Sequence, residues 1–241
     1  MAKSAIVFNY PRSRRSLYYN STSQINRLDR SIRNMAISKT LPNVDDLPSQ
    51  IVIESPANLK YWTVQEYHRM SDLGILDPSQ RTELIAGQIV LMTSKGTPHV
   101  ITLQLLATNI QAQLGTTALI RTQDPIRLDN FSEPEPDLAI VKGSILDYAQ
   151  AHPGAEDIYL VIEVADSTLK QDCEVKDKLY ARSSIVEYWV IDIKNRQVQI
   201  FRDPTPTGYS SQLILTETHS VSPLAFPEIS VAIESILPPA Q

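Results

Sequence analysis

Apolar positions recur with a helical period in three parts of the chain. Residues 63–74 are expected to form a helix, because Thr63 and Glu66 have the spacing of a capping box. Residues 99–114 have apolar side chains at helical intervals and are followed by Gly115, so a second helix is expected there. Residues 168–184 show the third helical pattern, with Ser167 and Thr168 as candidate caps.

Shorter apolar runs between these helices predict strands. Residues 82–93 hold two apolar runs around Ala86 and Gly87, which indicates a hairpin. Residues 158–165 and 188–193 are almost continuously apolar, the pattern of strands covered on both faces. Weaker patterns predict further strands at 119–128 (broken at Pro125), at 138–141, at 198–201 and within the last forty residues. We therefore expect an α+β fold, with a central mixed sheet flanked by the helices at 99–114 and 168–184.

Charge divides the 241-residue chain into a basic start and an acidic remainder. Residues 1–40 carry eight Lys or Arg and one acid, a net charge of +7; the whole chain is −5, so residues 41–241 sum to −12. We expect residues 51–241 to form one domain and residues 1–50 to be a flexible extension. The alternatives for the basic segment are a DNA-binding arm or a translation start at Met35, which would exclude it from the protein.

Several classes of function are disfavoured by what the sequence lacks. Cys173 is the single cysteine, so neither an internal disulfide nor a cysteine-rich zinc site is expected. The four histidines have no zinc-protease spacing, and no Walker, dinucleotide-binding or G-x-S-x-G motif occurs. No run of 18 apolar residues and no signal-peptide core is present, so we expect a cytoplasmic protein with no membrane partner.

Two carboxylates stand where their burial would need an explanation. Glu163 interrupts the apolar strand pattern at 158–165, and a lone buried carboxylate is costly unless it is paired or bound to a metal. Asp137 stands at the start of the neighbouring strand pattern, where an ordinary strand-end carboxylate is the alternative. Side by side, the two carboxylates could hold Mg²⁺, which favours one or two carboxylates together with water and phosphate oxygens.

A lysine is expected to point toward these acids from the third helix. On a helical wheel Lys176 lies in the centre of the mostly apolar stripe, whereas Lys178 lies on the opposite, solvent-facing side. An inward lysine needs an anionic partner, so Lys176 is either a functional residue or a structural partner of Glu163 or Asp172.

These residues together resemble a known nuclease superfamily. The pattern PD…EV…D-x3-K-x3-Y…EYWVID is similar to that of the PD-(D/E)xK nucleases, and within them to the Uma-two family of restriction-endonuclease-like proteins. The pieces that match are RTELIAGQIV, EPDLAIV, LVIEVADST, the ladder Asp172/Lys176/Tyr180 and EYWVID, spread over residues 60–202. Two positions depart from the pattern. Ala165 stands where the superfamily usually has its lysine, and Ser184 where the family usually has glycine.

The resemblance implies a restriction endonuclease-like fold and a site built from Glu83, Asp137, Glu163 and Lys176. The three acids would bind Mg²⁺ or Mn²⁺, Lys176 would replace the lysine missing at Ala165, and the substrate would be DNA. A homodimer is expected if both strands are cut. The acidic body disfavours nucleic-acid binding, so the alternative is a catalytically inactive nucleic-acid- or protein-binding module on the same fold.

Four nearby residues have simpler interpretations. Glu83 could lie on the exposed face of the hairpin. Asp172 is expected to cap or pair locally, and Tyr180 to belong to the core. His99 is expected to be a surface or capping histidine, with a contact to substrate phosphate as the alternative.

Overall fold

The structure is a computed structural model that describes residues 59–166 and 168–239. These residues belong to one unit, Ala57–Gln241. The predictions for residues 1–50 and for a start at Met35 lie outside the described residues. In the part of the chain that is described, no helix is both long enough and apolar enough to cross a membrane.

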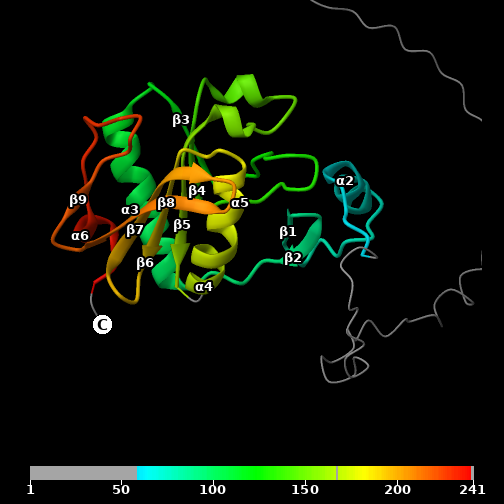
Figure 1. The fold of residues 1–241 in the computed structure, drawn as a ribbon, viewed down its shortest axis with the longest axis horizontal. Coiled ribbons are helices and arrows are strands. Elements are labelled where there is room, and N and C mark those ends of the chain that lie inside the picture. Colours follow the sequence, from blue (N-terminus) through cyan, green and yellow to red (C-terminus); the bar gives the residue numbers. More distant parts are fainter. Residues whose placement is uncertain (1–58, 167, 240–241) are drawn as a thin grey trace, which may run out of the picture. The chain divides into compact units, whose positions relative to one another are not determined.

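A six-stranded mixed sheet forms the centre of this unit (Figure 1). Its strand order is β3-β4-β5-β6-β7-β8, and every neighbouring pair is antiparallel except β5 and β6, which run parallel. The bounds are β3 Leu119–Thr122, β4 Leu138–Val141, β5 Ile158–Ala165, β6 Glu187–Asp192, β7 Gln197–Thr205 and β8 Gly208–Thr216. Two small antiparallel pairs stand apart from it: β1 Thr82–Ile85 with β2 Gln88–Leu91, and β9 Ser220–Val221 with β10 Val231–Ala232.

The helices lie before, between and, in the case of α6, after these strands. Their bounds are α2 Val64–Asp72, α3 Thr97–Leu114, α4 Leu169–Gln171, α5 Asp177–Arg182 and α6 Ile233–Ile236, with 3-10 turns η3 Ile145–Tyr148 and η4 Ala155–Asp157. Between α4 and α5 the chain forms a π turn, η5 Asp172–Lys176. Such turns hold one residue more than an α turn and are frequent at functional sites. The parallel pair β5–β6 needs a crossover connection, which α4, η5 and α5 provide.

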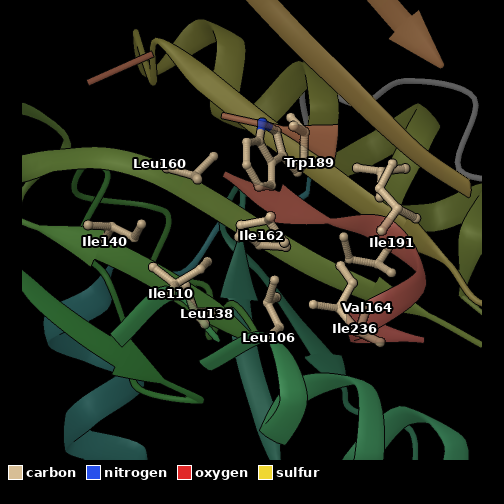
Figure 2. Packing of buried hydrophobic residues seen from close by; sticks show 14 of the residues in the cluster. Leu106, Ile110, Leu138, Ile140, Leu160, Ile162, Val164, Trp189, Ile191 and Ile236 are labelled. Carbon is tan, nitrogen blue, oxygen red and sulfur yellow. The ribbon is translucent and has the colours of Figure 1, made fainter. Parts of the chain in front are cut away.

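Each face of the sheet has its own apolar core. On one face, Leu106 and Ile110 of α3 pack with Ile162, Trp189 and residues of α6 (Figure 2). On the other face, Tyr180 of α5 packs with Val161 of β5 and with β6. Successive strand side chains point to opposite faces, so β5 contributes to both cores and is buried along nearly its whole length.

Most of the predicted elements are confirmed. Thr63 and Glu66 form the expected capping box, and the hairpin turns at Ala86 and Gly87. The third helix differs from its prediction, because the π turn interrupts it and Thr168 makes no side-chain capping bond in the described structure. The strands predicted within the last forty residues are confirmed as β8, β9 and β10, although β8 is a nine-residue edge strand rather than a short one. The strand predicted at 119–128 ends at Thr122.

Candidate active site

Strand pairing brings Asp137 next to Glu163. Leu138 of β4 pairs with Ile162 of β5, so the residue before β4 lies beside the residue that follows Ile162. The backbone amide of Asp137 lies 3.4 Å from Glu163 Oε2, and the Val164 amide donates to Asp137 Oδ2 at 2.9 Å. Both carboxylates are about 95% buried. The sheet itself therefore fixes the two acids side by side.

The helical crossover supplies an amine to the same place. Lys176, at the end of the π turn, donates to Glu163 Oε1 at 2.8 Å, and its Nζ lies 3.6 Å from Glu83 Oε1. Tyr180 lies one turn further along, and its hydroxyl donates to the same oxygen of Glu163 at 2.9 Å. Lys178 is exposed. Lys176 thus points inward, as predicted.

Glu83 reaches the site from β1. Its side chain is buried, so the alternative of an exposed hairpin position is wrong. Its Oε2 accepts a hydrogen bond from the Glu135 amide at 3.1 Å, while its other oxygen faces Lys176. Glu83, Asp137, Glu163 and Lys176 are therefore all brought together, although they come from four separate segments.

Two further nitrogen-bearing side chains approach Asp137, that of His99 in α3 and that of Lys95 just before it. His99 Nε2 is hydrogen-bonded to Asp137 Oδ1 at 3.0 Å, and Lys95 Nζ lies 3.3 Å from the same oxygen. His99 is buried, so the expectation of a surface histidine is wrong. Asp172 pairs locally as expected, accepting from the Thr168 hydroxyl at 2.6 Å. Tyr180 belongs to the core as expected, although its hydroxyl serves the site.

The side chains surround one pocket that is strongly acidic. Two amines, from Lys95 and Lys176, and the His99 ring line it together with six carboxylates: Glu83, Glu135, Asp137, Glu163, Asp166 and Asp172. With both amines charged and Glu135 paired with Arg81, three of the six carboxylates lack a lysine or arginine to balance them. Buried carboxylates that outnumber their basic partners either remain protonated or bind a cation.

Burial dominates the proton affinities of these acids. It raises the pKa of Glu163 to about 8, since the charged form loses its hydration and the attraction of Lys176 offsets only part of that loss. Burial likewise raises the pKa values of Glu83 and Asp172. Burial also acts to raise the pKa of Asp137, but hydrogen bonds from His99 and the Val164 amide, with the charge of Lys95, hold it below its ordinary value.

The pKa of the amine that contacts these acids is also raised, but by their charges and against the effect of burial. Burial acts to lower the pKa of Lys176, yet the surrounding carboxylates, Glu163 first and then Glu83 and Asp172, outweigh burial and raise it. Lys176 therefore stays protonated at neutral pH. Glu163, which is bonded to it, gives up its proton only near pH 8.

The donor atoms suit a hard divalent cation, but the ligands are not drawn together. Oxygen ligands from carboxylates are those that Mg²⁺ prefers, and Asp137, Glu163 and Glu83 all face the pocket. Within residues 59–166 and 168–239, however, no three acidic, histidine or cysteine side chains are close enough together to hold a metal ion. In this structure Lys176 lies between Glu163 and Glu83 as their shared counter-ion.

Three pocket residues were not identified from the sequence. Lys95, Glu135 and Asp166 lie in loops, where no periodic pattern indicates which way a side chain points. The one available signal was their position: Glu135 is two residues from Asp137, Asp166 follows the strand of Glu163, and Lys95 precedes the start of α3.

Comparisons with solved structures show the fold. The crystal structure of a "putative nuclease belonging to DUF820" from Anabaena variabilis ATCC 29413 has a TM-score of 0.57 with 16% sequence identity, covering 72% of this chain and 96% of that one. The type IIG restriction endonuclease BpuSI matches with a TM-score of 0.33 and 15% identity over 47% of this chain and 12% of its own, a likeness too low to carry an argument. A comparison with curated proteins gave no match.

A family model supplies the assignment that the distant structures do not. The model, described as "Putative restriction endonuclease", matches residues 64–234, which is well over half of the chain. The resemblance noted in the sequence and the α+β fold with a mixed sheet are both confirmed. This chain therefore belongs to the Uma2 (Uma-two) family.

Proposed function

We propose that this protein is a Mg²⁺- or Mn²⁺-dependent endonuclease that hydrolyses phosphodiester bonds of DNA. The observation that carries the proposal is the meeting of Asp137 and Glu163 on paired strands with Lys176 at 2.8 Å from Glu163, all lining one acidic pocket. Membership of a family described as restriction endonucleases supports it. Cutting both strands would need two such sites, so a cytoplasmic homodimer is part of the proposal.

The residues of the site divide the work between them. Asp137 and Glu163 would hold the cation, with Glu83 beside them, and the bound cation would offset charge on the phosphate as a Lewis acid. Lys176 would orient the attacking water and stabilise the negative charge that develops at the phosphate. Tyr180 and the Asp137 amide hold the Glu163 carboxylate in position through hydrogen bonds.

Plasmid nicking tests the activity. Purified protein with Mn²⁺ or Mg²⁺ is expected to nick supercoiled DNA, and Glu163→Ala and Lys176→Ala are each expected to lower the rate by about 100- to 1,000-fold, the usual cost of removing one charge-stabilising group. Lys178→Ala, on the exposed side of α5, is the matched lysine control. Equal nicking by the wild type and both site variants would overturn the proposal.

One feature favours a second candidate, a non-catalytic nucleic-acid- or protein-binding module. Lys176 already balances Glu163 and Glu83 in a closed, buried ion pair, and none of the described residues form a three-ligand metal group. Buried ion pairs of this kind occur as purely structural features.

Thermal melting in a metal titration separates the two candidates. An ion that binds only the folded chain stabilises it by about 2.7 kcal/mol when its concentration is a hundred times its Kd. If the protein is a metal-dependent nuclease, its melting temperature should therefore rise with Mn²⁺. The double variant Asp137→Asn, Glu163→Gln should lose that rise. A melting temperature that does not respond to the ion in the wild type would favour the binding module.

A further inference from the structure

Lys95 is a second buried amine in the pocket, and its role is not that of Lys176. It lies in the loop between β2 and α3, directly before Gly96, the N-cap residue of α3. Its side chain is 17% exposed, and the nitrogen itself is buried. Since the amine carries three N–H donors, its hydrogen-bond partners are the first question.

Among the residues that the structure describes, no acceptor makes a well-aligned hydrogen bond with Lys95 Nζ. The charge of this amine also reaches Glu83, but the one ion pair that it makes within the described residues is with Asp137 Oδ1, at 3.3 Å. That oxygen is already approached by His99 at 3.0 Å and by the Gln123 side-chain amide at 3.4 Å. Asp137 therefore offers Lys95 charge but little remaining hydrogen-bonding capacity, whereas buried donors are nearly always satisfied.

Lys176 provides the contrast within the same pocket. Its ammonium donates to Glu163 at 2.8 Å and lies 3.6 Å from Glu83, so it is held between two carboxylates. A substrate phosphate that entered this pocket would meet carboxylates on most sides. Of the two lysines, Lys95 is the one whose donors are still available to an incoming anion.

We infer that Lys95 is a substrate-binding residue whose ammonium donates a hydrogen bond to a non-bridging oxygen of the phosphodiester backbone. The inference rests on the proposed function. It adds to that function the residue that would bind a negatively charged DNA phosphate in a pocket lined by carboxylates. A phosphate oxygen supplies the hydrogen-bond acceptor that Lys95 lacks among the described residues, together with a further negative charge. Gly96, the N-cap residue of α3, also lines the pocket, so the amino end of this helix adds positive electrostatic potential to that of Lys95.

The experiment measures DNA binding separately from cleavage. A short fluorescent duplex is titrated with the full chain in Ca²⁺ at several salt concentrations, and the duplex is checked for intactness. Lys95→Gln is expected to weaken binding about tenfold and to reduce the slope of log K against log salt by about 0.9, the change for one lost phosphate contact. Lys178→Gln, the same change on the exposed side of α5, should leave the slope as in the wild type.

A charge-preserving variant and the melting temperature exclude a purely structural role. Lys95→Arg should recover most of the affinity and the salt slope, because it restores the charged donor. A wild-type salt slope in Lys95→Gln would overturn the inference. So would a weakened affinity that only accompanies a lower melting temperature. If Lys95→Gln lowers the salt slope but the wild type does not nick DNA, the phosphate contact stands and the proposed nuclease function fails. If the wild type nicks DNA but Lys95→Gln keeps the wild-type slope, the nuclease function stands and the role inferred for Lys95 fails.

Discussion

Two glutamates are buried on adjacent strands of the sheet, and their surroundings differ. Glu187, at the start of β6, is fully buried and saturated with donors. Arg202 reaches its Oε1 with two N–H groups at 2.6 and 2.9 Å, and the Trp189 indole donates to the same oxygen at 3.0 Å. The Leu224 amide donates to Oε2 at 2.7 Å. Such a carboxylate has little acceptor capacity left for a ligand.

Glu163, on the neighbouring strand β5, is buried among other acids instead. Lys176 and Tyr180 both donate to its Oε1, while the one donor near its Oε2 in the described part of the chain is the Asp137 amide at 3.4 Å. It also lines a pocket, and burial raises its pKa to about 8. The difference shows that burial alone does not mark a functional carboxylate. The number of donors on each oxygen and the presence of neighbouring acids separate the two cases.

Replacing the basic partner of each glutamate should give the largest difference in stability between the two positions. Arg202→Met would leave Glu187 buried without its cationic partner, and breaking such a pair costs about 3 kcal/mol or more of the free energy of unfolding. Lys176→Met should cost much less, because Glu163 can take up a proton at neutral pH. Urea unfolding at pH 7 measures both variants.

An exposed arginine controls for the loss of a positive charge. Arg182→Met on the surface of α5 is expected to change stability little. If Lys176→Met were as costly as Arg202→Met, Glu163 would be a structural carboxylate of the same kind as Glu187, and the contrast between them would disappear.

The pH dependence of stability should show which glutamate holds a proton. Between the ordinary glutamate pKa near 4.5 and a folded-state pKa of about 8, the folded chain binds a proton at Glu163 that the unfolded chain lacks. Stability from this group is therefore full at low pH and falls as pH rises, by up to about 1.4 kcal/mol per pH unit. Glu163→Gln cannot titrate, so its stability relative to the wild type should increase from pH 5 to pH 8 and then level off.

Stability curves of the two proteins at matched pH values provide the measurement. Glu174→Gln, at an exposed position of the π turn, is the control and should follow the wild type. A constant difference between Glu163→Gln and the wild type across this range would mean that Glu163 is ionised throughout.

The smallest expected effect lies at the end of α5, outside the pocket. Ser184 has a positive φ of 62°, a conformation that costs a residue with a Cβ about 1–2 kcal/mol, whereas glycine loses about 0.5–1 kcal/mol in chain entropy. Ser184→Gly should therefore stabilise the chain by about 0.5 kcal/mol and leave nicking unchanged. Urea unfolding and the plasmid assay check both parts. A loss of stability would mean that the serine side chain contributes a contact that outweighs the strain.

The parts of the fold that the sequence predicts best are those with uniform surroundings. β5 is covered on both faces, so its apolar run and the exceptional Glu163 were both visible. β8 was hard to predict because it is the edge strand, where Leu213 and Ile214 are adjacent, point to opposite faces and are both about half exposed. The usual alternation of apolar and polar residues is therefore lost.

The site was predictable where one element sets the direction of a side chain. Helical geometry alone indicated that Lys176 points inward, and strand pairing indicated the neighbourhood of Asp137 and Glu163. Lys95 could not be predicted, because its contact with Asp137 depends on how the loop before α3 meets the start of β4. Apart from the Trp189 indole on the same strand, the donors around Glu187 likewise come from β7 and a distant loop, which no local pattern links to it.

The π turn at Asp172–Lys176 makes the chemistry of the pocket depend on residue count as well as residue identity. Deleting any one of its residues would restore the α-helical pitch and rotate one side of the helix against the other by about 100°. Lys176 and Tyr180, which now share a single oxygen of Glu163, both follow residues 172–175, so loss of one of those four residues would turn both side chains away from Glu163 together unless α4 turned instead. A one-codon deletion, without any change of side chain, would thus be enough to disconnect the helix from the acids on the sheet.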